Sequence, residues 1–215
     1  YQTVQFGGEE DGGAQPASLQ LGHGATAVAT ARAFTQGSLM ETGNALDLAV
    51  QGDGFFQVRR PDGSVAYTRD GTLRLDAEGT VVTQGGLALE PDLAVPPDAV
   101  DVHVSQDGIV TVRLQGEPDP IEIGQVELAR FTNPAGLRAL GGNVYEQTDA
   151  SGEPAIGVPG EDGLGAVAQG FLESANVDVV QEMVDLIAAQ RAYELNSKMV
   201  TTAEEMLQIA NNVKR

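Results

Sequence analysis

The glycines and prolines of this chain stop well before its end. All 27 glycines lie at or before Gly170 and all 10 prolines at or before Pro159, so the last 45 of the 215 residues contain neither. Because glycine and proline mark turns and interrupt helices, this distribution predicts a change of structure near residue 170. We expect a mainly β fold with a long C-terminal α-helix (α+β), in which 30–170 form a β-rich domain and 171–215 a helix.

The region 30–170 carries the patterns of antiparallel strands and tight turns. Leu46, Leu48 and Val50 alternate with Asp47, Ala49 and Gln51, which is typical of a half-buried strand. Pairs of an acidic residue and glycine, which favour hairpin turns, recur at Asp53-Gly54, Asp62-Gly63, Asp70-Gly71, Glu78-Gly79 and Asp107-Gly108. These patterns predict an antiparallel, meandering β domain, with a hairpin at Asp107-Gly108 between two valine-rich strands.

The start of the chain has a different composition. The stretch from Gly7 to Gly13 contains no apolar residue, and such a stretch cannot contribute to a packed core. We therefore expect 1–29 to be an extended or mobile N-terminal segment. Because the first residue is Tyr1 and not Met, we also expect a further stretch upstream of it.

The C-terminal segment has a helix start signal and an apolar repeat. Asp178, followed three residues later by Gln181, resembles a capping box. The candidate interface residues, which recur at helical or coiled-coil spacing, are Val179, Met183, Leu186, Tyr193, Met199, Ala203, Met206 and Ala210. A helix from Asp178 to Val213 would be about 50 Å long, too long to bury this stripe on its own β domain. We expect it to form a coiled coil with other helices; the alternative is an amphipathic helix folded back over the sheet.

The charge and the absent residue types exclude several classes of function. Twelve basic residues against 31 acidic ones give a net charge of −19, which argues against a nucleic-acid partner and against a polybasic membrane patch. The absence of cysteine excludes disulfides and thiolate metal sites. No apolar run is long enough to span a membrane, and no secretory signal is visible.

A search for catalytic chemistry finds no candidate that outweighs a structural interpretation. The two histidines, His23 and His103, lie far apart, which argues against a transition-metal site, and no serine lies in a G-x-S-x-G motif. Gly52-Asp53-Gly54 is followed by Phe55 and not by a helix, so it predicts a tight turn and not a phosphate cradle. The absence of tryptophan disfavours a sugar cleft with a carboxylate pair. We predict no catalytic residue, no metal site and no cofactor.

Two segments resemble the bacterial flagellar basal-body rod and hook proteins. The first is Asp-Leu-Ala-Val-Gln-Gly-Asp-Gly-Phe-Phe-Gln-Val at 47–58, with Glu-Thr-Gly-Asn at 41–44 before it and Ala-Tyr-Thr-Arg-Asp-Gly at 66–71 after it. The second is Gly-Phe-Leu-Glu-Ser-Ala-Asn-Val-Asp at 170–178, with Gln-Arg-Ala-Tyr-Glu-Leu-Asn-Ser-Lys at 190–198. The second segment is most similar to that of the distal-rod members. The resemblance covers about residues 20–215, and the two motifs together are highly specific.

The resemblance implies a structural role. Members of this family stack helically into a tube, with paired N- and C-terminal helices in an inner coiled-coil layer and a β-rich domain outside it. It implies that 171–215 belong to the inner layer, that 30–170 are the outer domain, and that 1–29 correspond to a rod-specific stretch. The family's N-terminal helix would precede Tyr1.

The resemblance also implies partners and a location. The partners would be other copies of this chain, proximal rod and hook subunits, the surrounding basal-body rings and the flagellar type III export apparatus. The location would be the periplasm-spanning rod. Two alternatives remain open at this point: another rod or hook-type subunit of the same family, and, in a different class, a secreted adhesin or binding module with a helical stalk. A hydrolase with a carboxylate pair is a more distant third.

Overall fold

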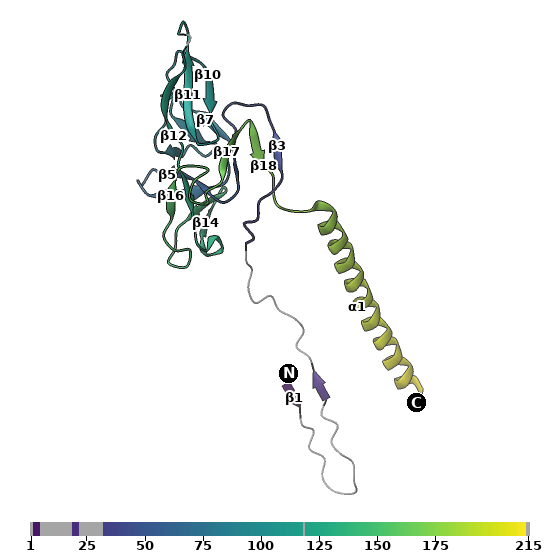
Figure 1. Ribbon diagram of the computed structural model, residues 1–215. Coiled ribbons are helices and arrows are strands. Elements are labelled where there is room, and N and C mark those ends of the chain that lie inside the picture. The colour runs from purple at the N-terminus through teal and green to yellow at the C-terminus, as the bar shows by residue number, and fades with distance from the viewer. Residues whose placement is uncertain (1, 5–18, 22–31, 118, 214–215) are drawn as a thin grey trace. The chain divides into compact units, whose positions relative to one another are not determined.

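The computed structural model describes residues 2–4, 19–21, 32–117 and 119–213 (Figure 1). The chain divides into two units, Tyr1–Ala33 and Phe34–Arg215. In the first unit, strands β1 (Gln2–Val4) and β2 (Leu19–Leu21) pair in antiparallel fashion. The rest of the segment that we expected to be extended, 1–29, lies outside the described residues.

The largest sheet of the second unit has nine strands among the described residues. Its order is β14-β15-β6-β5-β9-β8-β7, with β13 also on β5 and β16 on β13. Its strands are β5 (Phe55–Arg59), β6 (Val65–Thr68), β7 (Leu73–Leu75), β8 (Val81–Thr83), β9 (Ala88–Glu90), β13 (Leu128–Arg130), β14 (Arg138–Gly141), β15 (Val144–Glu146) and β16 (Ala155–Gly157). A 3₁₀ turn, Pro134–Gly136, precedes β14. All the pairings are antiparallel, as predicted, but β6–β15 and β5–β9 join strands that are not consecutive.

A smaller sheet is the predicted meander. It consists of β10 (Ala99–Val104), β11 (Ile109–Leu114) and β12 (Ile121–Gln125) in sequence order. Val102 lies opposite Val112 and Val104 opposite Val110. The turn between them has Gly108 at φ +80°, a backbone conformation that glycine adopts without strain. The hairpin predicted at Asp107-Gly108 is therefore confirmed.

Two ribbons join segments that are far apart in the sequence. Strand β4 (Leu48–Gln51) pairs with β17 (Ala166–Gln169), and β3 (Leu39–Glu41) pairs with β18 (Phe171–Glu173). Leu48, Ala49 and Val50 are all buried, so the prediction of a half-buried strand here was wrong. β4 is enclosed on both faces, and its alternation of large and small residues does not mark a solvent-exposed side.

Three of the five predicted turns close hairpins. Gly63, Gly79 and Gly108 have positive φ and lie in the turns of β5–β6, β7–β8 and β10–β11. Gly54 has positive φ, but β4 and β5, on either side of it, do not pair with each other. At Gly71 the backbone of Leu48 comes so close that a Cβ would lie 1.6 Å from the Leu48 carbonyl oxygen. The glycine is needed there for close approach.

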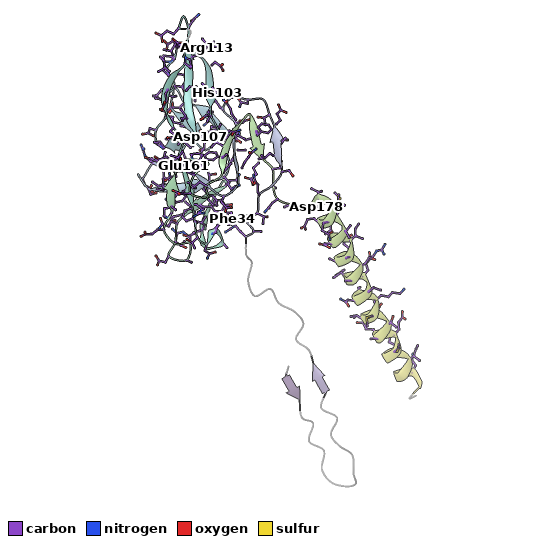
Figure 2. All side chains as sticks on the ribbon, in the orientation of Figure 1. Phe34, His103, Asp107, Arg113, Glu161 and Asp178 are labelled. Atoms are coloured by element: carbon purple, nitrogen blue, oxygen red, sulfur yellow. The ribbon has the colours of Figure 1, made fainter. Side chains whose placement is uncertain are left out.

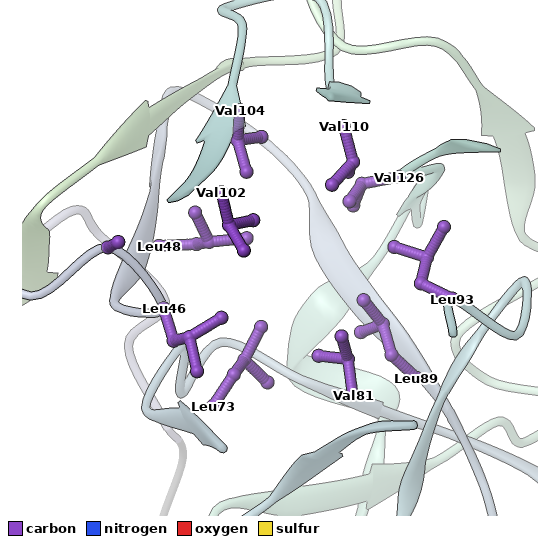
Figure 3. Close-up of a pocket in the computed structure, with 11 residues that line it drawn as sticks. Leu46, Leu48, Leu73, Val81, Leu89, Leu93, Val102, Val104, Val110 and Val126 are labelled. Carbon is purple, nitrogen blue, oxygen red and sulfur yellow. The ribbon is translucent and has the colours of Figure 1, made fainter. Parts of the chain in front are cut away.

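The core has two parts. The larger part is built mainly from leucine and valine side chains of both sheets and of the β4–β17 ribbon, including Val50, Val58 and Leu128, together with Phe56. The smaller part is aromatic, with Phe131 packed edge-on against Phe55 and Tyr67. A cavity of about 20 Å³ lies in the larger part and is lined by alanine, leucine and valine side chains (Figure 3). A cavity of this volume has room for about one water molecule, and its apolar lining offers that water no polar partner, so it is a packing gap.

The last element is helix α1 (Val179–Val213), drawn in green to yellow in Figure 1. The helix begins one residue after the predicted cap at Asp178, but the prediction of a helical segment from 171 was wrong at its start. Residues 171–173 form β18, because their backbone groups pair with β3. The fold is thus mainly antiparallel β with one long C-terminal helix among the described residues, as predicted. No helix in this part of the chain combines the length and the apolar character needed to cross a membrane.

Candidate assembly interface

Helix α1 leaves its apolar side chains uncovered. Every side chain that the structure describes in α1 is exposed, and its large apolar residues are between 51% and 77% exposed. The residues predicted for the interface that fall in this exposed set are Val179, Met183, Leu186, Tyr193, Met199, Ala203 and Met206. Ala210 lies in α1, and its side chain is outside the described part.

Sequence reasoning missed further exposed apolar residues on the same helix. They are Val180, Val184, Ile187, Leu195, Val200 and Ile209. A signal for the first three was present, because Val180, Val184 and Ile187 also follow one another at steps of four and three residues. A search for a single coiled-coil stripe selects the series Val179, Met183 and Leu186 and omits the neighbouring series, which has the same spacing.

The helix begins at a capped end, labelled by Asp178 in Figure 2. The Oδ1 atom of Asp178 accepts hydrogen bonds from the backbone N–H groups of Val180 at 2.9 Å and Gln181 at 3.2 Å. These groups have no partner within the helix, which is why an acidic residue is favoured at this position. The Gln181 side chain donates to Asp185 Oδ1. The predicted cap at Asp178 is therefore present. The Gln181 side chain does not complete a capping box, because its amide is hydrogen-bonded to Asp185 one turn further along the helix.

The β3–β18 ribbon, which leads into the helix, is fastened to the β domain by polar contacts. Arg69 Nε donates to Glu173 Oε2 at 2.8 Å, and Glu173 Oε1 accepts from the backbone N–H of Gly37 at 2.8 Å. The Asn176 side chain donates to the carbonyl oxygen of Thr35 at 3.0 Å. A Cβ at Gly37 would lie 1.9 Å from the Ser174 carbonyl oxygen. Residues 35–37 and 173–176 therefore lie against each other just before the helix begins.

The two segments that carry the family resemblance meet at this place. Thr42 N–H donates to the Gly170 carbonyl oxygen at 2.8 Å, and Gly170 N–H donates to the Asp47 carbonyl oxygen at 2.8 Å. The buried Asp47 carboxylate accepts from Thr42 Oγ1 and Asn44 Nδ2. The residues of 41–47 thus hold the chain at Gly170, where the β domain passes into the C-terminal segment.

Several charged side chains of the β domain form ion pairs or hydrogen bonds within turns. Asp92 and Glu90 raise the pKa of the Arg59 guanidinium through side-chain hydrogen bonds. Hydrogen bonds from Ser64 lower the pKa of Asp62 in the β5–β6 turn. His103, labelled in Figure 2, is exposed on β10, and His23 lies outside the described residues. Within the described ranges, no group of three or more His, Asp or Glu is placed to hold a metal ion.

A β domain joined to a long helix whose apolar side chains are uncovered defines a class of protein: a structural subunit of a larger assembly. Burial of large apolar surface is the main driving force of association. A helix that exposes residues such as Leu186 and Met206 is therefore suited to contact with other chains.

The comparisons with known proteins point to one such family. Residues 49–112 match the family described as flagellar hook protein FlgE/F/G D1 domain, and residues 168–213 match flagellar basal body rod FlgEFG protein C-terminal. The flagellar basal-body rod protein FlgG of Buchnera aphidicola subsp. Schizaphis graminum is 44% identical over 210 residues, which cover 97% of this chain and 81% of the relative. FlgG of Borreliella burgdorferi is 44% identical over 203 residues, covering 94% and 77%. The rod protein FlgF of Caulobacter vibrioides is 36% identical over 181 residues, covering 82% and 68%.

The chain therefore belongs to the family of flagellar basal-body rod proteins. It is a structural component of the bacterial flagellum, located in the rod of the basal body. The resemblance found from residues 41–71 and 170–198 is confirmed.

Proposed function

We propose that this chain is a subunit of the distal rod that polymerises helically with copies of itself and links the motor to the hook. In this proposal 30–170 form the outer domain, and 171–215 contribute a helix to an inner coiled-coil layer. Subunits would pass through the type III export apparatus, cross the periplasm as a rod within the basal-body rings, and meet proximal rod and hook subunits at the two ends. The similarity to FlgG proteins, which covers 97% and 94% of this chain, supports the distal position.

The observation that carries the proposal is the uncovered apolar surface of α1. The residues proposed for the assembly interface are Val179, Met183, Leu186, Tyr193, Met199, Ala203, Met206 and Ala210. A helix of this length that stays exposed in water is marginally stable, because helices in proteins owe most of their stability to packing an apolar face. Assembly would supply that packing.

A second candidate is another rod or hook-type subunit of the same family. It is favoured by the match to a family that includes hook and rod proteins, and by the FlgF relative. The FlgG relatives are more similar over a larger share of the chain, so we place the distal rod first.

The proposal also includes the absence of catalysis. Several of the described charged groups are engaged in ion pairs, such as Arg59 with Asp92 and Arg60 with Asp62. Incubation of the purified chain with peptidoglycan fragments, the polymer nearest to a rod that crosses the periplasm, should give no turnover. Hydrolysis that is lost on changing one carboxylate would contradict this part of the proposal.

The test of the assembly function uses charge at the interface. Leu186→Asp and Met206→Asp each place a carboxylate where apolar contact is expected. An unpaired buried charge costs several kcal/mol, and the cost recurs at every subunit. Ser197→Asp, on the polar side of the second half of the helix, is the matched control. Strains with either interface variant should lose the complete rod and motility, while the control strain swims.

The purified variants check that the effect is on assembly and not on folding. The thermal midpoint of the β domain should be the same in Leu186→Asp, Met206→Asp and Ser197→Asp, because all three positions are exposed in the single chain. A full-length rod and normal swimming with either interface variant would show that α1 does not assemble through these residues.

A further inference from the structure

A groove of about 570 Å³ lies beside strand β10 in the β domain. Among the described strands, β10 pairs only with β11, and the turn that joins β7 to β8 also lines the groove (Figure 1). A second hollow of about 380 Å³ shares Asn44, Ala45, Asp101 and Val102 with the first. The two hollows therefore form one elongated depression along β10, which we call the β10 groove.

The lining of the β10 groove includes both buried and exposed apolar side chains. Val95 is 5% exposed, whereas Leu75 is 39% exposed and Val100 is 64% exposed. Pro96 and Pro97, which follow Val95, belong to the same lining. Apolar side chains that gather in a hollow are typical of a surface that receives the apolar side chains of a partner. The lining therefore favours a ligand with apolar groups.

The acidic and basic residues of the β10 groove are four carboxylates and one histidine. The carboxylates are Glu41, Asp76, Glu78 and Asp101, the histidine is His103, and no lysine or arginine lines the groove. Asp76 Oδ1 already accepts hydrogen bonds from backbone N–H groups of the β7–β8 turn. The Glu41 and Glu78 carboxylates are exposed and have no hydrogen-bond partner in the part of the chain that the structure describes. The groove therefore offers carboxylates to a cationic ligand.

The ion pair that Asp101 forms leaves its carboxylate accessible. Asp101 Oδ2 lies 3.4 Å from Arg113 Nη2, and the two side chains are 58% and 54% exposed. An ion pair that is this exposed is weak, because water screens both charges. A cationic group of a ligand can therefore take the place of Arg113.

The backbone of β10 is partly occupied on the groove side. The Gln169 side chain donates from Nε2 to the Val102 carbonyl oxygen at 2.8 Å, and its Oε1 atom accepts from the Val104 N–H at 3.1 Å. Nε2 also donates to the Ala45 carbonyl oxygen at 2.8 Å. These bonds take the backbone groups that an added strand would need. A ligand of this groove is therefore recognised by side-chain contacts and not by extension of the sheet.

We propose that the β10 groove binds an extended, basic segment of another protein, in which apolar residues alternate with lysine or arginine. In an extended chain, successive side chains point to opposite faces, so every second residue can face Val95 and Val100. The long lysine and arginine side chains between them can reach Glu78 and Asp101 at the rim. The acidic rim and the basic ligand are electrostatically complementary.

The charge of the chain argues against a second copy as the occupant. The net charge is −19, so two copies repel each other. The sequence has two adjacent pairs of basic residues, Arg59-Arg60 and Lys214-Arg215. Arg59 and Arg60 already form ion pairs with Glu90, Asp92 and Asp62. The inference goes beyond the proposed function and does not depend on it, because binding in this groove requires no rod.

A synthetic peptide tests the proposal on the purified full chain. The probe is a fluorescein-labelled peptide of eight residues in which valine and lysine alternate, and binding is measured by fluorescence anisotropy. It should bind, and a higher salt concentration should weaken the binding because salt screens exposed charges. A peptide of alternating valine and glutamate and one of alternating serine and lysine should each bind at least roughly tenfold more weakly. No binding of the valine–lysine peptide, or equal binding of the serine–lysine peptide, would overturn the proposal.

Charge-reversal variants locate the binding in the groove. Glu78→Lys combined with Asp101→Lys should weaken binding by roughly tenfold or more. The matched control is Asp149→Lys combined with Glu153→Lys, which changes the net charge equally at exposed positions that do not line the groove. Its affinity should stay within about twofold of that of the unmodified chain, because salt screens distant charges. Equal losses in the two double variants would indicate attraction to the overall charge and overturn the proposal.

The apolar contribution has its own pair of variants. Val100→Ser should weaken binding several-fold, whereas Ile156→Ser should not, since Ile156 is 53% exposed and lies outside the groove. Sedimentation of the chain without peptide tests the alternative occupant. Oligomers of the unmodified chain that are lost in Val100→Ser would show that a second copy fills the groove, which contradicts the proposal.

Photochemical cross-linking gives a second readout that needs no variant to fold. A valine–lysine peptide that carries a benzophenone group at its centre is irradiated with the unmodified chain, and the adducts are located by mass spectrometry. The adducts should lie within 75–79 and 95–103, the two segments that line the groove around β10. Adducts spread over the acidic surface, or confined to α1, would overturn the proposal and leave the distal-rod function untouched.

Discussion

Arg69 and Glu173, which are 104 positions apart in the chain, form an ion pair at 2.8 Å whose side chains are only 17% and 11% exposed. Arg69 Nη2 also donates to the Gly52 carbonyl oxygen at 2.9 Å, and Glu173 Oε1 accepts from Gly37 N–H. The pair therefore links the end of β6, the β4–β5 turn and the strand that precedes the helix. Each partner comes from one of the two segments by which the family was recognised.

Removal of one partner should weaken the β domain substantially. Glu173→Ala leaves the Arg69 guanidinium with carbonyl partners but no carboxylate, and breaking a mostly buried pair costs about 3 kcal/mol. Glu146→Ala is the control, because its partner Arg138 is 66% exposed and exposed pairs contribute under about 1 kcal/mol. Denaturant unfolding followed by tyrosine fluorescence measures both. Equal losses of unfolding free energy in the two variants would show that the Arg69–Glu173 pair contributes no more to stability than the exposed pair.

Gly71 should tolerate no side chain. A Cβ there would lie 1.6 Å from the Leu48 carbonyl oxygen, which belongs to backbone that is itself paired with β17. Forcing these segments apart should lower the stability by about 3 kcal/mol, seen as a lower thermal midpoint of Gly71→Ala. Gly85→Ala is the comparison, because the nearest atom to its Cβ would be Thr83 Oγ1 at 3.7 Å, and its midpoint should stay close to that of the unmodified chain.

Tyr67 should make the β domain sensitive to alkaline pH. Burial raises the pKa of the Tyr67 phenol, so the folded chain keeps this proton to a higher pH than the unfolded chain, whose tyrosines ionise near pH 10. The contribution to stability is fully present below about pH 10 and is lost as the pH rises above it. Tyr67→Phe keeps the packing against Phe131 and removes this loss. Unfolding measured at pH 7 and above pH 10 should show a smaller alkaline decrease in the variant; equal decreases would contradict the assignment.

The parts of the fold that were predictable are those determined by nearby residues. The β10–β11 hairpin follows from Asp107-Gly108 and the valines on either side, and the helix follows from the cap at Asp178 and the absence of glycine after 170. The β4–β17 and β3–β18 pairings were not predictable, because they join strands more than 100 residues apart and short apolar strands have many possible partners.

The burial of polar groups was the second feature that could not be predicted from the sequence. Asp47 was expected on a solvent-exposed side, yet it is buried because Thr42 and Asn44 donate to its carboxylate. For the interface, the sequence indicated Val179, Met183 and Leu186 by their spacing. It did not reveal that the apolar residues before residue 190 and those after it lie on different sides of the helix, since each of the two series is regularly spaced by itself. The difference in direction is seen only when both series are placed on one continuous helix.

The last prediction concerns the start of that helix. Asp178 Oδ1 caps two backbone N–H groups, at 2.9 and 3.2 Å, and replacing such a cap by alanine costs about 1 kcal/mol. In the unassembled chain α1 has little packing to compensate for this loss, so Asp178→Ala should lower the helical content measured by circular dichroism, while the thermal midpoint of the β domain is unchanged. Asp178→Ser keeps an oxygen that can accept the same bonds and should restore most of the signal. If the alanine and serine variants have the same helical content as each other, the cap at Asp178 does not control how much of α1 is formed.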